Sequence, residues 1–370
     1  AARRPRRGRP HPQGRRGADL HPKHLVETGN CLKGLQALAA YHRRRFDIPI
    51  VGITGSNGKT TTKEMLRSIC ARVGLTCANS GNLNNQLGVP LSLLELTPAH
   101  RYGLFEMGAS RPGEIEELGL IAQPSVGVLT NIGPAHLEFF GTLEQTFKTK
   151  SELIDVMSPE TKIALNIDDP WLTCLEQSLG PRAVTYGKHP RARVRIEGAN
   201  TLIIDRHSIE VPLAAFGDLS RYNAAAAAAA AHALGLDADV IAQGLKNYQP
   251  AKLRLEKRLH PSGCHLVIDA YNANPASMRA GIEAFCEHYA ADKKILVLGD
   301  MKELGPESAK FHAELGSWLA GLSLEAVYLA GPEMKSSYEA LKALRPAFKF
   351  FHGAPEQWLP ALIASAGSGK

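Results

Sequence analysis

IPIVGITGSNGKTTT, residues 48–62, is the stretch that decides the fold of this chain. Its first seven residues, 48–54, are rich in β-branched side chains and predict a buried strand. The strand ends at Gly55, and the stretch 61–74 then carries apolar residues three or four positions apart, which predicts a helix. A strand, a glycine loop and a helix in this order open a parallel α/β unit.

The loop between this strand and this helix has the composition of a phosphate-binding loop. Glycines leave backbone N–H groups free to surround phosphate oxygens at a helix N-terminus. In such a loop Lys59 reaches the β- and γ-phosphates, and the Thr60 hydroxyl binds Mg²⁺. The strict eight-residue pattern would place a glycine at position 53, where this chain has Ile53. The sequence therefore predicts an ATP site built on a compact form of the loop.

Beyond the loop, short apolar strands alternate with helical or loop stretches. The predicted strands are 102–105, 126–130 and 162–166, and an amphipathic helix, 32–46, precedes the first strand. This alternation predicts an α/β fold whose central domain is a doubly wound sheet of the phosphate-loop type. Short alternating segments within 191–211 predict an antiparallel excursion from that sheet.

The second half of the chain continues with helices and a second α/β pattern. An alanine-rich run, 224–231, predicts a close-packed helix opened by Asn223, because alanine has the highest helix propensity. A Rossmann-like C-terminal domain is predicted to begin near Arg254, with strands at 265–268 and 294–298 and helices from Ser277 and over 311–319. We expect three regions, which are 1–46, 47–253 and 254–370.

Composition excludes several classes of function. The chain of 370 residues has a formal charge of +7, but seven arginines precede the first acid, Asp19, and the remainder is balanced, which argues against a nucleic-acid partner. These arginines are Arg3, Arg4, Arg6, Arg7, Arg9, Arg15 and Arg16. Proline and glycine in this tail favour disorder, and no apolar run approaches the roughly 20 residues of a membrane span. Six scattered cysteines without a CxxC pair indicate reduced thiols in the cytoplasm.

Further polar residues follow the predicted strands. Glu106 comes directly after the strand 102–105, and carboxylates at the carboxyl ends of parallel strands face the ligand crevice. Beside a phosphate loop such a carboxylate is a candidate ligand of the Mg²⁺ that accompanies ATP. His136 follows another strand, and Lys150 lies fourteen residues later.

Several segments together resemble the Mur ligase family. They are GSNGKTTTKEM (55–65), GNLNNQLGVPLSLLEL (81–96), FEMGASRPGEI (105–115), NIGPAHLEFFG (131–141), KTKSEL (148–153) and DAYNANPASM (269–278). The resemblance runs from about Leu32 to the end of the chain. The YNANP segment resembles the corresponding segment of the family branch that joins D-alanyl-D-alanine to UDP-N-acetylmuramoyl-tripeptide.

The resemblance implies a set of site residues. Those implied in ATP binding are Gly55, Ser56, Asn57, Gly58, Lys59, Thr60, Thr61, Asn223, Arg254 and Asp269. Those implied in holding two Mg²⁺ ions are Thr60 and Glu106 for the first ion, and His136 and a carbamylated Lys150 for the second. Those implied in catalysis are Lys59, His136 and Lys150, and those near the acceptor substrates are Asn84, Asn85, Asn272 and Asn274.

The chain also departs from the family pattern. The family's nucleotide segment usually reads Gly-x-His-Asn or Gly-x-Tyr-Asn, whereas in this chain Gly217 is followed by DLSRY before Asn223. The common Gly-Arg-Leu motif reads Leu253-Arg254-Leu255. We expect only the last helix of the family's uridine-nucleotide domain before Phe46, and no final Lys-Gly-Ser-Arg strand.

The implied activity is an ATP-dependent ligase that works through an acyl phosphate. Its partners would be small molecules, with no nucleic acid and no membrane span, and we expect a monomer. One alternative is a glutamate-adding ligase of the folylpolyglutamate synthetase type, which shares the loop and the two-domain architecture. The other is a catalytically silent remnant that still binds nucleotide.

Overall fold

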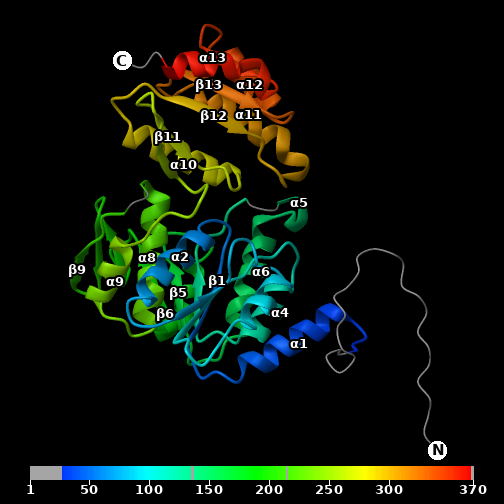
Figure 1. The fold of residues 1–370 in the computed structure, drawn as a ribbon, viewed down its shortest axis with the longest axis vertical. Coiled ribbons are helices and arrows are strands. Elements are labelled where there is room, and N and C mark those ends of the chain that lie inside the picture. Colours follow the sequence, from blue (N-terminus) through cyan, green and yellow to red (C-terminus); the bar gives the residue numbers. More distant parts are fainter. Residues whose placement is uncertain (1–26, 135–136, 214–215, 368–370) are drawn as a thin grey trace, which may run out of the picture.

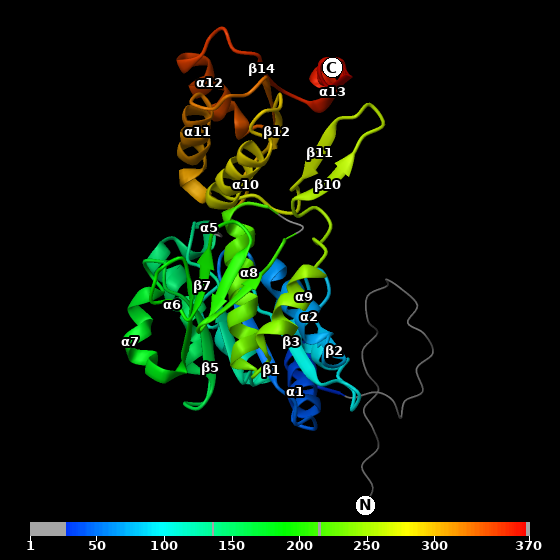
Figure 2. The same cartoon turned by 90° about the vertical axis from the view of Figure 1, so that its left-hand side faces the viewer.

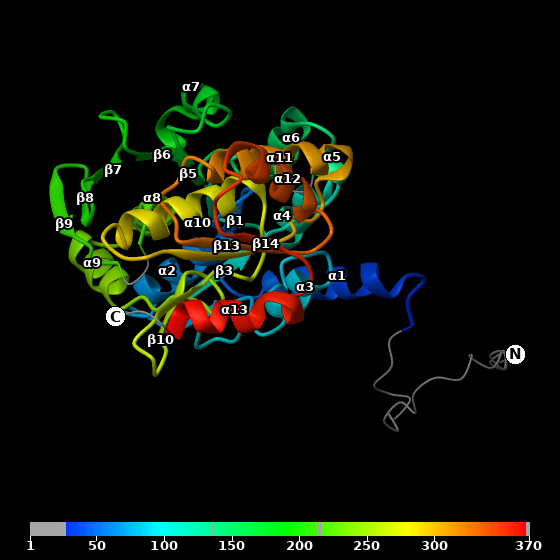
Figure 3. The ribbon, with the colours of Figure 1, turned by 90° about the horizontal axis from the view of Figure 1, so that it is seen from above.

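The computed structural model of the chain describes residues 27–134, 137–213 and 216–367. Figure 1 shows a larger α/β region, coloured from blue to green, with a smaller α/β region, coloured from yellow to red, at one end of it. Seen from above, the smaller region overlies part of the larger one, with α1 (Cys31–Arg43), α7 (Glu176–Leu179) and the strands β7 to β9 (residues 194–210) extending beyond it (Figure 3). Within the described ranges, no helix is long and apolar enough to cross a membrane.

The larger region is built on one nine-stranded sheet. Its strand order is β2-β3-β1-β4-β5-β6-β7-β8-β9, parallel from β2 to β7 and antiparallel from β7 to β9. The strands are β1 (Ile50–Thr54), β2 (Thr76–Ala78), β3 (Tyr102–Glu106), β4 (Val126–Leu129), β5 (Lys162–Asn166), β6 (Ala183–Gly187), β7 (Val194–Glu197), β8 (Thr201–Ile204) and β9 (His207–Glu210). The predicted doubly wound sheet is confirmed. The antiparallel excursion is confined to β8 and β9, because β7 pairs in parallel with β6.

Helices cover both faces of this sheet and form two separate cores. One face packs against α2 (Lys59–Cys70), α8 (Asp218–Ala233) and α9 (Ala238–Lys246). The other face packs against α1 (Cys31–Arg43), α3 (Gly88–Leu93), α4 (Glu114–Ala122) and α6 (Leu143–Asp155). Shorter helices are α5 (Leu137–Phe140), η2 (Thr173–Leu175), α7 (Glu176–Leu179) and η3 (Gly180–Arg182). Alternate residues of β1 enter the two cores, as the pleat of a strand requires.

Helix α8 holds the alanine-rich run. The helix was predicted to open at Asn223 but begins earlier, at Asp218, after Gly217 with a φ of 86°. The Ser220 hydroxyl donates to the Phe216 carbonyl at 3.0 Å, which supports this earlier start. All eight alanines, 224–231, are buried, so their short side chains let α8 approach both the sheet and α2 closely.

The smaller region begins with the hairpin of β10 (Glu256–Leu259) and β11 (His265–Ile268), which Figure 2 shows projecting beside the junction of the two regions. A parallel sheet of β12 (Ile295–Gly299), β13 (Ala326–Ala330) and β14 (Phe350–His352) follows. Its helices are α10 (Pro275–His288), η4 (Gly305–Glu307), α11 (Ser308–Leu319), α12 (Met334–Leu344) and α13 (Pro355–Gly367). The parallel three-stranded sheet with helices agrees with the predicted Rossmann-like pattern.

Candidate active site

The phosphate loop joins β1 to α2 and depends on two glycines. Gly58 has a φ of 81° and forms the N-cap of α2, a backbone conformation that side chains disfavour. A Cβ on Gly58 would lie 2.1 Å from the Asn223 amide oxygen, and one on Gly55 would lie 2.0 Å from the Thr130 hydroxyl. Both positions therefore exclude any larger residue.

The end of β4 holds the loop in place. The Ser56 and Asn57 N–H groups donate to Asn131, to its carbonyl at 2.9 Å and its amide oxygen at 3.0 Å respectively. The Thr130 hydroxyl donates to the Asn57 carbonyl at 2.6 Å, and the Ser56 hydroxyl accepts from the Gly133 N–H at 2.9 Å. The loop is thus shaped by the protein itself before any phosphate binds.

Lys59 lies across the loop. Its ammonium donates to the carbonyls of Gly55 at 2.8 Å and Ser56 at 3.0 Å. Burial lowers the pKa of Lys59, while the nearby Glu106 carboxylate opposes this and the Arg254 guanidinium adds to it. Its ammonium is therefore within the loop that is predicted to receive the phosphates.

Thr60 and Glu106, the two residues implied for the first Mg²⁺, are in contact. The Thr60 hydroxyl donates to Glu106 Oε2 at 2.8 Å, and the Asn84 amide donates to Glu106 Oε1 at 2.7 Å. Glu106 is 2% exposed. Arg254 Nη2 approaches the Thr60 hydroxyl at 3.4 Å, so a residue far along the chain reaches the same point.

The sequence reasoning missed Asn79, which fixes the backbone of Glu106. Its amide oxygen accepts from the Glu106 N–H at 3.0 Å, and its amide nitrogen donates to the Glu106 carbonyl at 2.9 Å. The ammonium of Lys63, a fully buried residue, donates to the Asn79 carbonyl. Its position directly after β2, at the carboxyl edge of the sheet, marked Asn79 as a candidate but did not reveal Glu106 as its partner.

Lys150 lies in α6 and is 2% exposed. Burial, reinforced by the charge of Lys59, lowers the pKa of Lys150 to about 7. Its ammonium is 5.3 Å from the centre of the Phe140 ring. His136, predicted to share a metal ion with Lys150, lies outside the described residues.

Arg254 comes from the connection between the two regions. Its neighbours Leu253 and Leu255 have φ values of 61° and 47°, a conformation rare for leucine. The Arg254 guanidinium lies over the Tyr271 ring, 4.2 Å from its centre. Backbone strain of this kind gathers at functional sites, and here it flanks the residue that reaches Thr60.

The remaining C-terminal candidates are Asn274, Asn272 and Asp269, and they differ in their burial and hydrogen bonds. The Asn274 amide donates to the Asn57 amide oxygen at 2.6 Å, which ties the start of α10 to the phosphate loop. Asn274 also forms a capping box with Ser277. Asn272 is exposed and accepts from the N–H of the next residue, and Asp269 is exposed directly after β11.

Three predicted residues have structural partners. The Asn85 amide oxygen accepts from the N–H groups at positions 87 and 88, at 3.2 and 2.9 Å, and so opens α3. The buried Asn223 approaches the Thr62 hydroxyl at 3.4 Å. The Thr61 side chain interacts with the hydroxyl of Tyr248.

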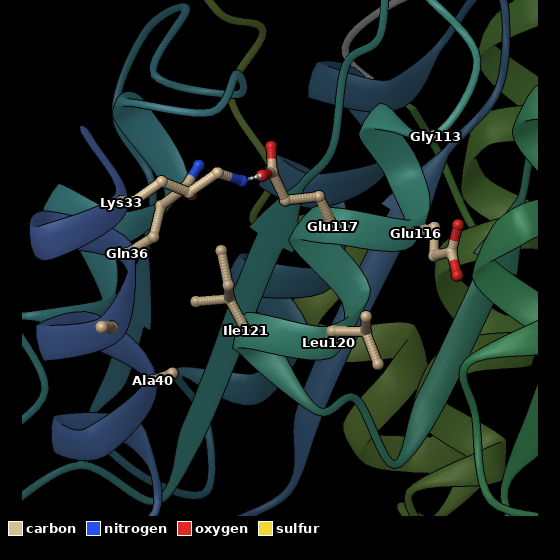
Figure 4. Close-up of a pocket in the computed structure, with 9 residues that line it drawn as sticks. Lys33, Gln36, Ala40, Gly113, Glu116, Glu117, Leu120 and Ile121 are labelled. Carbon is tan, nitrogen blue, oxygen red and sulfur yellow. Dashed lines mark hydrogen bonds and ion pairs between the residues drawn. The ribbon is translucent and has the colours of Figure 1, made fainter. Parts of the chain in front are cut away.

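Two features of the described residues concern ligand binding. No group of three or more His, Cys, Asp or Glu side chains that could hold a metal ion is found among them. A groove of about 520 Å³ lies between α1 and α4, and Figure 4 shows Lys33 and Glu117 meeting across it. None of the predicted site residues lines this groove.

Comparison with known proteins assigns the family. Residues 53–231 match the Mur ligase middle domain, and residues 253–369 match the Mur ligase, glutamate ligase domain. The UDP-N-acetylmuramoyl-tripeptide–D-alanyl-D-alanine ligase of Treponema pallidum is 35% identical over 314 residues, which are 83% of this chain and 67% of that protein. The chain belongs to the Mur ligase family. The predicted family resemblance is confirmed.

Other Mur ligases are also similar to this chain, in sequence and in structure. The ligase of the same name from Synechocystis is 36% identical over 307 residues, 82% of this chain and 66% of that protein. The structure of the MurF ligase from Thermotoga maritima in complex with ADP has a TM-score of 0.76 and 28% identity, and covers 95% of this chain and 87% of that one. The chain spans about two thirds of the length of these curated relatives.

A folylpolyglutamate synthase from Mycobacterium tuberculosis also shares the fold. Its TM-score is 0.69 at 14% identity, with 91% of this chain and 89% of that one covered. At this identity the likeness concerns the fold alone.

Proposed function

We propose that this Mur ligase joins D-alanyl-D-alanine to UDP-N-acetylmuramoyl-tripeptide at the expense of ATP. The observation that carries the proposal is the contact between Thr60 and Glu106 at the end of the phosphate loop. The names of the related ligases supply the substrates. We also propose that the chain acts as a monomer on small molecules.

The Thr60 and Glu106 pair fits a magnesium ion. Mg²⁺ prefers oxygen ligands and is commonly held by one or two carboxylates together with substrate phosphates and water. A hydroxyl and a carboxylate with oxygens 2.8 Å apart offer that chemistry. Mg²⁺ bound there would neutralise charge on the ATP phosphates.

Lys150 fits carbamylation, which would make it an anionic ligand for a second Mg²⁺ beside His136. Its pKa of about 7 leaves much of the amine neutral at neutral pH. In the proposed step the free amine nitrogen attacks the carbon of CO₂, one C=O electron pair moves to oxygen, and one amine proton leaves to solvent. The product is a carbamate, whose oxygens suit Mg²⁺ where an ammonium does not.

The proposed reaction has two steps. A carboxylate oxygen of the tripeptide attacks the γ-phosphorus, the bond to the β-phosphate oxygen breaks, and ADP leaves. The amine of D-alanyl-D-alanine then attacks the acyl carbon of the resulting acyl phosphate, loses a proton, and displaces phosphate. Lys59 and the loop N–H groups would hold the phosphates and offset the charge that gathers as two anions approach. Asn84 and Asn85 would lie on the acceptor side, with Asn272 and Asn274 on the dipeptide side.

Nucleotide recognition completes the proposal. Asn223, Arg254 and Asp269 are proposed to contact the nucleotide beyond its phosphates. The position of Asn223 against Gly58 and that of Arg254 against Thr60 support this. We also propose a division into domains at 253/254, because residues on either side form separate cores.

The compartment proposed for this chemistry is the cytoplasm. All six cysteines are free thiols, as a reducing compartment keeps them. The buried thiols of Cys70 and Cys77 are unreactive, because burial raises the pKa of Cys70 to about 12 and that of Cys77 to about 11.

Phosphate release from ATP tests the proposed activity. The purified chain is incubated with Mg²⁺, ATP, UDP-N-acetylmuramoyl-tripeptide and D-alanyl-D-alanine, and each component is omitted in turn. We expect sustained release only with the complete mixture, together with formation of the UDP-linked pentapeptide. A parallel reaction with folate and glutamate covers the folylpolyglutamate alternative. Turnover in that reaction alone would refute the proposed substrates, and nucleotide binding without turnover in either would favour the silent remnant.

A further inference from the structure

Thr54, the last residue of β1, carries a hydroxyl without an evident purpose. The residue is fully buried, and among the described residues its Oγ1 has no hydrogen-bond partner. A buried hydroxyl left unpaired is costly, and native proteins seldom keep one without a reason. The hydroxyl therefore points to a group that is not part of the unmodified chain.

The pleat of β1 tells which face Thr54 occupies. Val51 and Ile53 enter the core with α2 and α8, whereas Ile50 enters the core with α4 and α6. Because successive side chains alternate, Thr54 shares the face of Ile50. Gly52 confirms this direction, since a Cβ on it would lie 3.2 Å from the Leu153 side chain of α6.

The course of α6 brings Lys150 to the same place. This helix connects β4 to β5, which both run parallel to β1, so it runs antiparallel to them. One turn back from Leu153 lies Lys150, on the same face of α6 and equally buried. Moving back along α6 corresponds to moving forward along β1, from Gly52 to Thr54. The unpaired hydroxyl and the buried amine thus share one layer.

We propose that Thr54 is a positioning residue whose hydroxyl donates a hydrogen bond to the carbamate formed on Lys150. The inference rests on the proposed carbamylation and adds the group that stabilises it. A carbamate brings two acceptor oxygens and a negative charge into a buried site, and hydrogen bonds to a charged acceptor are the stronger kind. Without CO₂ the same hydroxyl has no acceptor, which is its state in the described chain.

The chain offers an isosteric variant and a matched control. Thr54→Val removes the hydroxyl and keeps the shape, and Thr54→Ser keeps the hydroxyl. Ser151 Oγ is also buried and unpartnered, but Ser151 lies about 100° further round α6 than Lys150. Ser151→Ala therefore removes a comparable hydroxyl that does not face β1.

The experiment measures the carbamate directly by ¹³C NMR of the intact chain equilibrated with ¹³C-bicarbonate. We expect a carbamate resonance in the wild type that is absent from Lys150→Ala. In Thr54→Val we expect the bicarbonate needed for half-maximal signal to rise roughly tenfold or more, as loss of a charged hydrogen bond implies. Thr54→Ser and Ser151→Ala should stay near the wild-type value. Thermal unfolding gives a second readout: in CO₂-free buffer Thr54→Val should melt no lower than the wild type, and in bicarbonate it should melt lower.

The outcomes distinguish the carbamylation of Lys150 from the role of Thr54. A wild type without the resonance would overturn the carbamylation and with it the role of Thr54. A resonance that titrates identically in the wild type and Thr54→Val would overturn the role of Thr54 alone. A loss of signal in Ser151→Ala equal to that in Thr54→Val would also overturn it, because the effect would then belong to α6 in general.

Discussion

The central sheet and the C-terminal region contribute to the candidate site in different ways. The central residues Glu106 and Lys150 are each 2% exposed, and Asn79 holds the Glu106 backbone from both sides. From the C-terminal region, Arg254 reaches the site on a strained connection, and Asn272 is exposed. The difference teaches that the residues proposed for phosphate and metal chemistry are buried and held from several sides, whereas Asn272, proposed for the dipeptide side, is exposed.

The cores of the two regions differ in the same sense. The nine-stranded sheet has a buried core on each face, and every residue of β1 is buried. In the smaller sheet, β12 alternates buried and exposed residues, and Val297 is 51% exposed. The central sheet can therefore hold strained and buried polar groups at a lower risk of local unfolding.

The largest effect is expected where the rigid region supplies a charge. Lys59→Ala should reduce ATP turnover by about 10³-fold, because a preorganised phosphate donor is lost, and should leave the fold intact because Lys59 belongs to neither core. Phosphate release and thermal melting are measured. Release should nearly cease, and the melting curve should be unchanged. Normal turnover, or a chain that no longer folds, would show that the loop assignment is wrong.

A somewhat smaller loss, about 10²-fold, is expected for Lys150→Ala. A short-chain carboxylate in the buffer should restore part of the activity, since it can replace the missing anionic oxygens in the cavity. Lys148→Ala is the control, because Lys148 lies on the same helix, pairs with Glu144 on the surface and has a side chain 62% exposed. Equal activity in both variants would reduce Lys150 to a structural lysine.

For the C-terminal region, Arg254→Ala should raise the KM for ATP by roughly tenfold, with little change in thermal stability. Its guanidinium reaches Thr60, but no core contact depends on it. Arg258→Ala provides the comparison, because Arg258 lies on the adjacent hairpin and forms an ion pair with a neighbour on the same strand, Glu256. A loss of kcat as large as that of Lys59→Ala would erase the contrast between the two regions.

The smallest effect is expected at Asn274, where a cap and an interregion contact share one side chain. Asn274→Ala should destabilise α10 by about 1 kcal/mol, whereas Asn274→Ser should restore the cap but not the bond to Asn57. Hydrogen exchange across α10 measures the first effect, and titration with a non-hydrolysable ATP analogue measures the second. Identical exchange in the alanine variant and the wild type would refute the capping role.

Local signals were sufficient for the core of the site. The phosphate loop, β1 and α2 follow from residues adjacent in sequence, and the Thr60 and Glu106 contact follows from the rule that parallel strands end at one edge. The start of α8 was predicted too late, at Asn223, because Asp218 and Ser220 favour turns in isolation and are helical here through tertiary packing.

Contacts between distant segments were beyond the reach of pattern reasoning. Nothing in its immediate sequence shows that Asn79 clamps Glu106, or that Asn274 reaches Asn57, because each pair is set by how strands and domains meet. The left-handed backbone of Leu253 and Leu255 was equally invisible, since leucine disfavours it. His136 falls outside the described residues, and its role stays a prediction.

The buried alanines 224–231 limit how this protein can change over evolutionary time. Each of the eight positions is enclosed, so a random substitution there almost always adds atoms where none fit. The same closeness lets a short amide, Asn223, approach Gly58. The tract should therefore stand out as a continuous intolerant block in a saturation mutagenesis map.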